Sequence, residues 1–308
     1  MFWGKSFDAE KDIPDLSGKV ILVTGSNTGL GKESVLQLVA HKPARVYLAA
    51  RTPAKAEAAI ADIKSHIPEA PITFLQLDLT SFESIKNAAT TFKSESDRLD
   101  ILMNNAGVMA TPYSKTSEGY ELQFGTNHVG HALLTKLLLP TLQRTAEEAG
   151  SDVRVINVTS AGHMMAPASG VELDMDALEK VNTMKRYGNS KLANILFARE
   201  FARRYPSITS VAVHPGVIFT DLYQSLGEKN FLLRWGTKLS APFVMGTPQA
   251  GAKNQLWAAT VPKAELENGA YYVPIGSKSG GTNLSRDPEQ AKKLWEWTEN
   301  EFAKHGIQ

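Results

Sequence analysis

The chain of 308 residues contains no cysteine, which excludes disulfide bonds and thiolate metal sites. It also lacks the run of about 18 apolar residues that a membrane-spanning helix needs. The nearest candidate, 132–142, is short and contains Lys136. A formal net charge of +1 gives no general attraction to nucleic acid or to an anionic membrane. Since the first residues have no signal-peptide core, we expect a cytoplasmic protein, with peripheral contact with a membrane or lipid surface left open.

What the sequence does contain is a regular alternation of short apolar runs and helix-like segments. Strands are expected at 19–24, 45–50, 72–77, 99–103, 153–158, 208–213 and 271–273. Helices are expected at 30–39, 54–65, 82–94, 126–146 and 187–205. This alternation predicts an α/β fold, with a parallel seven-stranded sheet covered by helices on both faces. We expect one domain over 1–308, which begins with an N-terminal arm at 1–17.

Two segments interrupt the alternation, and both follow strand ends, where ligands bind in such sheets. The first, 163–186, is rich in Met, Pro, Gly and acidic residues. The second, 217–247, is expected to form a substrate lid, with Met164 and Met165 as the opposite wall of the pocket. Its apolar residues include Leu222, Tyr223, Leu226, Phe231, Leu232, Leu233 and Trp235. Completion of a core helix is the alternative interpretation of these residues.

A glycine-rich turn follows the first predicted strand. Gly25 allows a tight turn, Gly29 lets the backbone approach a pyrophosphate, and Gly31 lets the helix pack closely on the strand. The free N–H groups of the following helix then face the phosphates. The turn therefore predicts a dinucleotide site. Its residues are Gly25, Asn27, Thr28, Gly29, Leu30 and Gly31.

The end of the second strand indicates which coenzyme is bound. NAD-binding sheets place an Asp or Glu about 20 residues after the glycines, where it holds the ribose hydroxyls. This chain has Arg51 there, and Lys55 follows four residues later. A guanidinium suits the 2′-phosphate of NADP, so NADP(H) is preferred over NAD(H). The alternative is that Arg51 is a solvated surface charge.

Tyr187 and Lys191 lie four residues apart on a predicted helix, so their side chains share one face. A tyrosine with its ordinary pKa of about 10 is a poor acid or base at neutral pH. A neighbouring cation favours the phenolate and brings the pKa towards working pH. The pair predicts general acid–base chemistry.

The glycine turn, Ser160 and the Tyr187–Lys191 pair together resemble the short-chain dehydrogenase/reductase family over about residues 19–273. Ser160 precedes Tyr187 by 27 residues, a spacing similar to that of the retinol-dehydrogenase-like and WW-domain-oxidoreductase-like branch. The resemblance implies a Rossmann fold with strand order 3-2-1-4-5-6-7. It also implies further cofactor-binding residues, namely Asp78, Leu79, Asn105, Ala106, Gly107, Tyr187, Lys191, Pro215, Gly216, Val217 and Thr220.

The resemblance implies four catalytic residues. Ser160 would polarise a carbonyl oxygen while Tyr187 gives up a proton and hydride arrives from NADPH. Lys191 would hold the nicotinamide ribose and lower the tyrosine pKa, and Asn127 with a water chain would resupply the proton. Thr159 is a rival to Ser160, although the motif favours Ser160. Instead of a catalytic role, Asn127 could have a purely structural one in which its hydrogen bonds are made within the protein. Instead of binding the cofactor, Asp78 could be a helix N-cap or turn residue.

These residues predict an NADP(H)-dependent carbonyl reductase or alcohol dehydrogenase that acts on a small lipophilic carbonyl or alcohol. The alternatives are a non-catalytic NADP(H) sensor and a nucleotide-sugar epimerase or dehydratase, which shares the Tyr-x-x-x-Lys pair. No metal is expected, because His128 and His131 have no Cys or Glu partner in a zinc spacing. A homodimer or homotetramer through the helices containing 133–142 and 195–202 is also expected from the resemblance, with burial in the core as the alternative.

Overall fold

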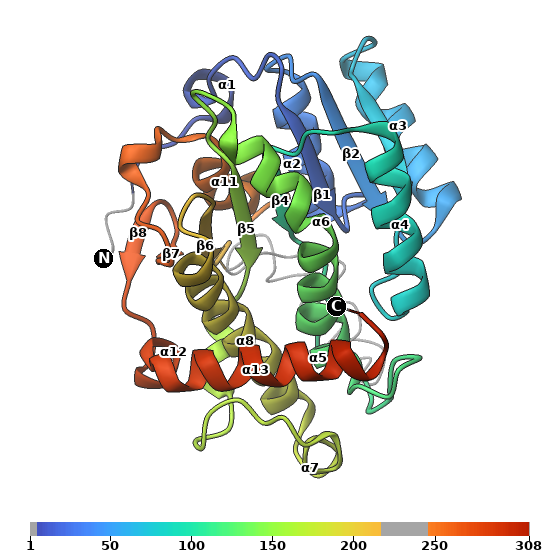
Figure 1. The fold of residues 1–308 in the computed structure, drawn as a ribbon. Helices are drawn as coiled ribbons and strands as arrows, with labels where there is room; N and C mark the ends of the chain where they lie inside the picture. The colour runs from blue at the N-terminus through green and yellow to red at the C-terminus, as the bar shows by residue number, and fades with distance from the viewer. Residues whose placement is uncertain (1–4, 217–245, 308) are drawn as a thin grey trace, which may run out of the picture.

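A single sheet of eight strands organises the part of the chain that the computed structural model describes, residues 5–216 and 246–307 (Figure 1). The strand order is β3-β2-β1-β4-β5-β6-β7-β8, and all neighbouring pairs are parallel except β7 and β8. The strands are β1 (Val20–Thr24), β2 (Arg45–Ala50), β3 (Ile72–Gln76), β4 (Ile101–Asn104), β5 (Arg154–Val158), β6 (Thr209–Val213), β7 (Tyr271–Val273) and β8 (Ser277–Ser279). The mixed α/β fold and the order of the first seven strands are confirmed.

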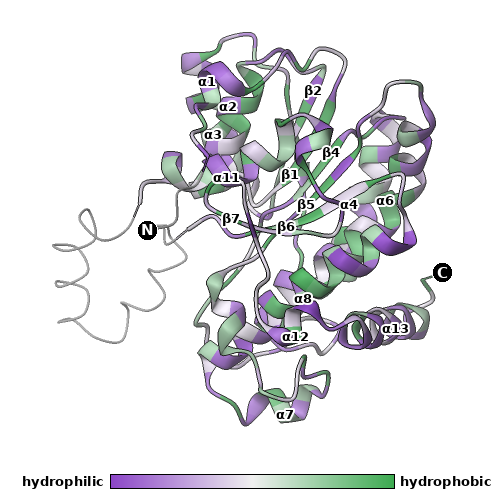
Figure 2. Cartoon of the chain, turned by 90° about the vertical axis from the view of Figure 1, so that its left-hand side faces the viewer, coloured by the Kyte–Doolittle hydropathy of each residue, from purple (hydrophilic) through white to green (hydrophobic). Residues whose placement is uncertain are grey.

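The central strands are mainly apolar because both faces of the sheet are covered. In β1, Val20 and Leu22 pack into one hydrophobic cluster, whereas Ile21 and Val23 pack into a second cluster. Successive side chains of a strand point to opposite faces, so a strand buried on both sides needs an unbroken apolar run. Figure 2 shows this apolar character along the central strands.

Helices cover the two faces of the sheet. On one face, α2 (Gly29–Val39), α3 (Pro53–His66) and α11 (Pro248–Thr260) enclose one cluster. On the other, α4 (Phe82–Glu95), α6 (Gly130–Glu147) and α8 (Thr183–Arg204) enclose the other cluster, and α13 (Pro288–Lys304) packs against α8 (Figure 1). Short helices complete the described chain: α1 (Ala9–Asp12), α5 (Leu122–Phe124), α7 (Met175–Glu179) and α12 (Asn283–Arg286).

The elements differ from the sequence-based expectations in three places. Seven strands were expected, but the sheet has an eighth, antiparallel strand, β8, which pairs with β7. The helix expected at 126–146 is present, but its first turn is the π-helical turn Gly125–Val129, which continues directly into α6. Helices α11 and α13 were not predicted at all. The expectation of one domain stays a prediction.

Most apolar residues of α6 and α8 lie in the core of the described chain, although Leu137 and Leu139 of α6 are only partly buried. Phe197 of α8 stacks on Trp295 of α13, with ring centres 5.5 Å apart and planes inclined by 12°. Lys136 of α6 pairs with Glu299 of α13 at 2.6 Å. Helix α13 therefore covers part of these helix faces, and pairing of two copies through them stays a prediction.

The N-terminal arm packs on the body over its described part, since Phe7, Ile13 and Leu16 are buried in the cluster shared with α2 and α11. Of the expected lid, 217–247, only the last two residues are described, and Thr247 caps the N-terminus of α11. None of the described helices combines the length and apolarity that crossing a bilayer would require.

Candidate active site

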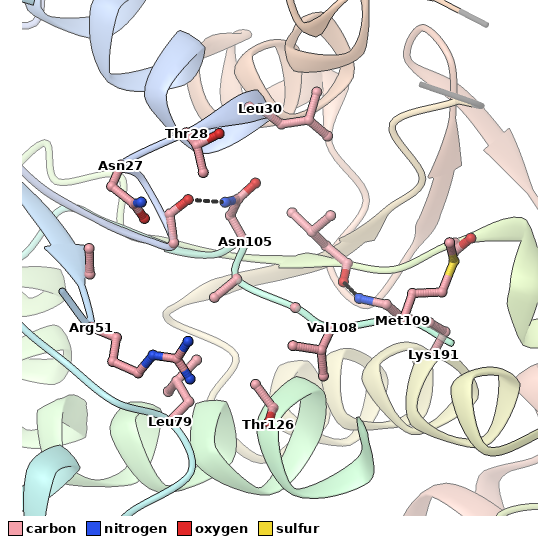
Figure 3. A pocket seen from close by; sticks show the side chains of 18 of the residues that line it. Asn27, Thr28, Leu30, Arg51, Leu79, Asn105, Val108, Met109, Thr126 and Lys191 are labelled. Carbon is pink, nitrogen blue, oxygen red and sulfur yellow. Dashed lines mark hydrogen bonds between the residues drawn. The ribbon is translucent and has the colours of Figure 1, made fainter. Parts of the chain in front are cut away.

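A cavity of about 480 Å³ opens along the C-terminal ends of β1, β4 and β5 (Figure 3). In a doubly wound sheet this is the crevice where the strand order reverses, between β1 and β4. Most of the predicted cofactor residues line it: Gly25, Asn27, Thr28, Gly29, Leu30, Gly31, Arg51, Asp78, Leu79, Asn105, Ala106, Gly107, Tyr187, Lys191, Pro215 and Gly216. Ser160 lines the same cavity. Val217 and Thr220 lie outside the described residues.

The glycine turn has no room for side chains. Gly25 has φ +63°, and a Cβ added there would come within 2.8 Å of the Cα and Cβ of Ala106. A Cβ on Gly31 would collide with the carbonyl oxygen of Gly25 and come within 2.6 Å of the Asn105 amide nitrogen. The backbone is therefore exposed to the cavity at the start of α2, where N–H groups and the helix dipole favour phosphate. These features fit a dinucleotide.

Asn105, which directly follows β4, holds the glycine turn by hydrogen bonds. Its Nδ2 donates to the carbonyl oxygen of Thr24 at 2.8 Å, and its Oδ1 accepts from Gln255 of α11 at 3.1 Å. Both bonds join strand ends and helices rather than pointing into the cavity. Asn105 therefore holds the turn in place, and it also lines the cavity, where it was predicted to contact the cofactor.

Arg51 and Asp78 border the cavity from β2 and β3. Arg51 is exposed and has no hydrogen-bond or ion-pair partner among the described residues, so its guanidinium is available to a ligand. Asp78 Oδ1 accepts from the Thr80 backbone N–H at 2.9 Å and from its hydroxyl at 2.7 Å. Asp78 thus shapes a turn, as its alternative interpretation held, and also lines the cavity. Lys55 is exposed on α3 and does not line the cavity.

Thr159 and Ser160 both line the cavity and differ in the hydrogen bonds of their hydroxyl groups. The Thr159 hydroxyl is buried and donates to the backbone oxygen of Lys191 at 2.7 Å. Ser160 Oγ lines the cavity and accepts from the Gly162 N–H at 3.0 Å. Because that bond uses only an acceptor position, the Ser160 hydroxyl proton remains available to donate to a substrate oxygen.

Tyr187 and Lys191 lie together on α8. Lys191 Nζ is 5.7 Å from the centre of the Tyr187 ring and donates to the Val158 carbonyl oxygen at 3.2 Å. Both side chains are buried, with 4% of each exposed. Burial lowers the pKa of Lys191 from 10.5 to about 8, which still leaves most of the amine protonated at neutral pH.

Asn127 lies behind the cavity in the π-helical turn and does not line it. Its Nδ2 donates to the Val108 carbonyl at 2.9 Å and to Ser190 Oγ at 2.9 Å, and its Oδ1 accepts from the Val108 N–H at 2.8 Å. These bonds match a satisfied structural asparagine. Its role in a water chain stays a prediction.

The histidines near the site are buried and neutral. Burial lowers the pKa of His128 to about 3 and that of His131 to about 4. His163 Nδ1 lies 2.8 Å from the Ser160 carbonyl oxygen, and its ring does not line the cavity. Within 5–216 and 246–307, no group of three or more metal-ligating side chains is present.

Several cavity residues had not been predicted, including Val108, Met109, Leu122 and Thr126. The first two directly follow the predicted motif 105–107, and that continuity was the available signal (Figure 3). Met164 and Met165 are 65% and 38% exposed and do not line the described cavity. The lid that they were expected to face lies almost wholly outside the described residues, so their place in the pocket wall stays a prediction.

Comparison with known proteins accounts for this arrangement. A family model described as short chain dehydrogenase matches residues 19–172. The chain belongs to the short-chain dehydrogenase/reductase family. Short-chain dehydrogenase/reductase drtF of Aspergillus calidoustus is 42% identical over 96% of this chain and 97% of its own length. Retinol dehydrogenase 12 of Mus musculus is 37% identical over 91% of this chain and 85% of its own, which indicates the retinol-dehydrogenase-like branch.

Solved structures agree in fold. A protein from Mycobacterium paratuberculosis matches with a TM-score of 0.73 and 28% identity, covering 96% of this chain and 97% of its own. An NADPH-bound carbonyl reductase from chicken fatty liver matches with a TM-score of 0.63 and 24% identity, covering 86% and 99%. This short-chain dehydrogenase/reductase is thus an oxidoreductase of a family that binds a nicotinamide cofactor.

Proposed function

We propose that this protein is an NADP(H)-dependent oxidoreductase that interconverts a lipophilic carbonyl compound and its alcohol, with Tyr187 as the general acid or base. The observation that carries the proposal is that Ser160, Tyr187 and Lys191 line the same cavity as the glycine turn. A nicotinamide cofactor in this cavity supplies or accepts the hydride. The side chains of the protein handle the proton and the orientation of the substrate.

Each of the three side chains has a distinct task in the proposed reaction. The Ser160 hydroxyl donates to the substrate oxygen while its own oxygen is held by the Gly162 N–H. The Tyr187 hydroxyl gives its proton to that oxygen in reduction, and its phenolate takes the proton back in oxidation. The Lys191 ammonium favours the phenolate, and its N–H groups other than the one bound to Val158 hold the ribose.

The preference for NADP(H) rests on Arg51. Its guanidinium borders the cavity at the end of β2 without a partner among the described residues, and the chain has no carboxylate at this position that would repel a 2′-phosphate. Guanidinium and phosphate form strong, charge-assisted hydrogen bonds.

Two observations support the proposal that the substrate is lipophilic. Val108, Met109 and Leu122 give the cavity an apolar side. A relative that is 37% identical is named retinol dehydrogenase 12, and retinol is a lipophilic alcohol. The apolar segment 217–247 lies mostly outside the described residues and adds no structural support.

The test is oxidation of NADPH in the presence of a panel of aldehydes and ketones of rising apolar area. We expect carbonyl-dependent turnover that is faster with NADPH than with NADH. NADPH binding without turnover on any carbonyl or alcohol would instead favour a sensor. Turnover of a nucleotide sugar without net oxidation of the cofactor would favour an epimerase or dehydratase.

A further inference from the structure

A buried histidine connects the glycine turn with the turn that holds Asn127. His131 lies on the first turn of α6, and only 3% of it is exposed. Its Nδ1 is 3.0 Å from the Asn127 carbonyl oxygen, and its Nε2 is 2.8 Å from the Thr24 hydroxyl. The ring therefore bridges the last residue of β1 and the π-helical turn.

The partners of His131 define its tautomer. A carbonyl oxygen can only accept, so Nδ1 must carry the proton that faces Asn127. The same ring is neutral, because burial lowers its pKa and the charge of Lys191 lowers it further. Nε2 is then an acceptor, and the Thr24 hydroxyl donates to it at 2.8 Å in preference to the Met103 carbonyl oxygen, which lies farther away at 3.4 Å.

The contact of His131 with Thr24 affects the backbone beside the glycine turn, at Asn105 and Ala106. Thr24 Oγ1 accepts from the backbone N–H groups of Asn105 and Ala106, each at 3.0 Å. When the hydroxyl proton points to His131, the oxygen lone pairs face these two donors. Asn105 and Ala106 line the cavity, and Ala106 limits the space at Gly25. Loss of the contact between His131 and Thr24 should therefore make the position of Asn105 and Ala106 beside the glycine turn less well defined.

The contact of His131 with Asn127 affects α8, the helix that carries Tyr187 and Lys191. Asn127 bonds Ser190, whose hydroxyl donates to the Tyr187 carbonyl oxygen at 2.8 Å. It also holds Val108, which lines the cavity. A shift of the Asn127 backbone would thus be passed to the segment that carries Tyr187.

We propose that His131 is a positioning residue that holds the Asn127 carbonyl through Nδ1 and the Thr24 hydroxyl through Nε2. The first contact supports the chemical step and the second supports cofactor affinity. This proposal rests on the proposed function, since it assigns the two contacts to turnover and to NADP(H) binding.

Two substitutions at His131 separate the two contacts. The amide of Asn reaches the place of Nδ1, so His131→Asn keeps the contact with the Asn127 carbonyl oxygen and loses the contact with Thr24. The amide of Gln reaches the place of Nε2, so His131→Gln keeps the contact with Thr24 and loses the contact with Asn127. His131→Asn should keep kcat near the wild-type value and raise the Kd for NADPH, measured by fluorescence titration, by about fivefold. His131→Gln should keep the Kd and lower kcat by about fivefold, as expected for one hydrogen bond. Thr24→Val should raise the Kd and Thr24→Ser should not.

The double variant His131→Asn/Thr24→Val should bind NADPH no more weakly than Thr24→Val alone. Thr24→Val already removes the contact that His131→Asn removes, together with the contacts of Thr24 Oγ1 with Asn105 and Ala106. If His131→Asn and His131→Gln lose affinity and turnover in parallel, or retain both, the proposal is overturned and His131 only fills space.

A readout independent of activity is the tautomer in the wild-type protein, by nitrogen-15 spectroscopy of its seven histidines. We expect a neutral ring with the proton on Nδ1 at pH 7, and a proton on Nε2 would overturn the proposal even if every variant fails to fold. A wild-type protein with this tautomer but no carbonyl turnover would contradict the proposed function and leave the bridge intact.

Discussion

The Nζ atom of Lys191 lies 5.7 Å from the centre of the Tyr187 ring, one helical turn away on α8. Both residues are buried, so the charge acts through a medium that screens less than water. The position of the amine is fixed by the Val158 carbonyl oxygen at the end of β5. The helix and the sheet thus hold the cation and the phenol in one arrangement.

The rate of carbonyl reduction should fall as the pH rises above about 8. Lys191 is protonated below its pKa of about 8 and loses its charge above it, so both its support of the phenolate and its hold on the ribose weaken. The measurement is kcat/KM against pH from about 6 to about 10, which reports groups of the free enzyme. Lys191→Met should have a lower rate and weaker cofactor binding, and should lack this limb of the profile. A limb of the same shape in that variant would assign the ionisation to another group.

Arg51→Glu should reverse the coenzyme preference. The substitution removes a charge-assisted contact with the 2′-phosphate and adds a carboxylate that repels it, which should lower the NADPH/NADH ratio of kcat/KM by about 10- to 100-fold. Lys55→Glu is the matched control, because Lys55 does not line the cavity, and it should change the ratio little. An equal effect of the two substitutions would point to long-range charge rather than to contact by Arg51.

Gly162→Ala should slow turnover by displacing Tyr187. A Cβ at this position would lie 2.7 Å from Tyr187 Cε1 and 3.3 Å from Ser160 Oγ. Displacement of a catalytic group by about 1 Å can lower the rate about 100-fold. The control is Gly150→Ala, where a Cβ has open space and the φ of +75° affects only stability. If kcat is the same in both variants, the tight packing around Tyr187 is not required.

In a series of aldehydes of increasing chain length, kcat/KM should rise with apolar area. Burial of one methylene contributes about 0.8 kcal/mol, so each added methylene that enters the pocket should raise kcat/KM by about fourfold. The rise should stop when the pocket is filled. A flat or falling trend from the shortest aldehyde onwards would argue against a lipophilic substrate.

The central sheet could be predicted from the sequence because its strands are buried on both faces. The unbroken apolar run in β2, for example, predicted its bounds, Arg45–Ala50, without error. By contrast, β8 consists of Ser277–Ser279 and has no apolar residue, so only its pairing with β7 defines it. Helix α13 did carry a signal, because Leu294, Thr298 and Phe302 recur at helical spacing after Asp287 and Pro288.

The candidate site was predictable where a residue type has a steric or chemical reason to stand at one position. Gly25 and Gly31 are examples, since a Cβ would collide with Ala106 or with the backbone of the turn. The contacts of His131 could not be predicted, because they join residues 24 and 131 through the fold. The sequence offered only its proximity to His128, a spacing at which no metal was expected because no Cys or Glu partner accompanies the pair.

The most direct test of the proposed chemistry is the single-turnover rate of NADPH oxidation by wild-type protein and by Tyr187→Phe, measured with saturating carbonyl substrate. The ring of the variant still packs on α8, so the Kd for NADPH should remain near the wild-type value. The proton donor is absent, so the rate should fall by about 10²–10⁴-fold. A variant that binds NADPH and oxidises it at nearly the wild-type rate would contradict the assignment of Tyr187 as the general acid.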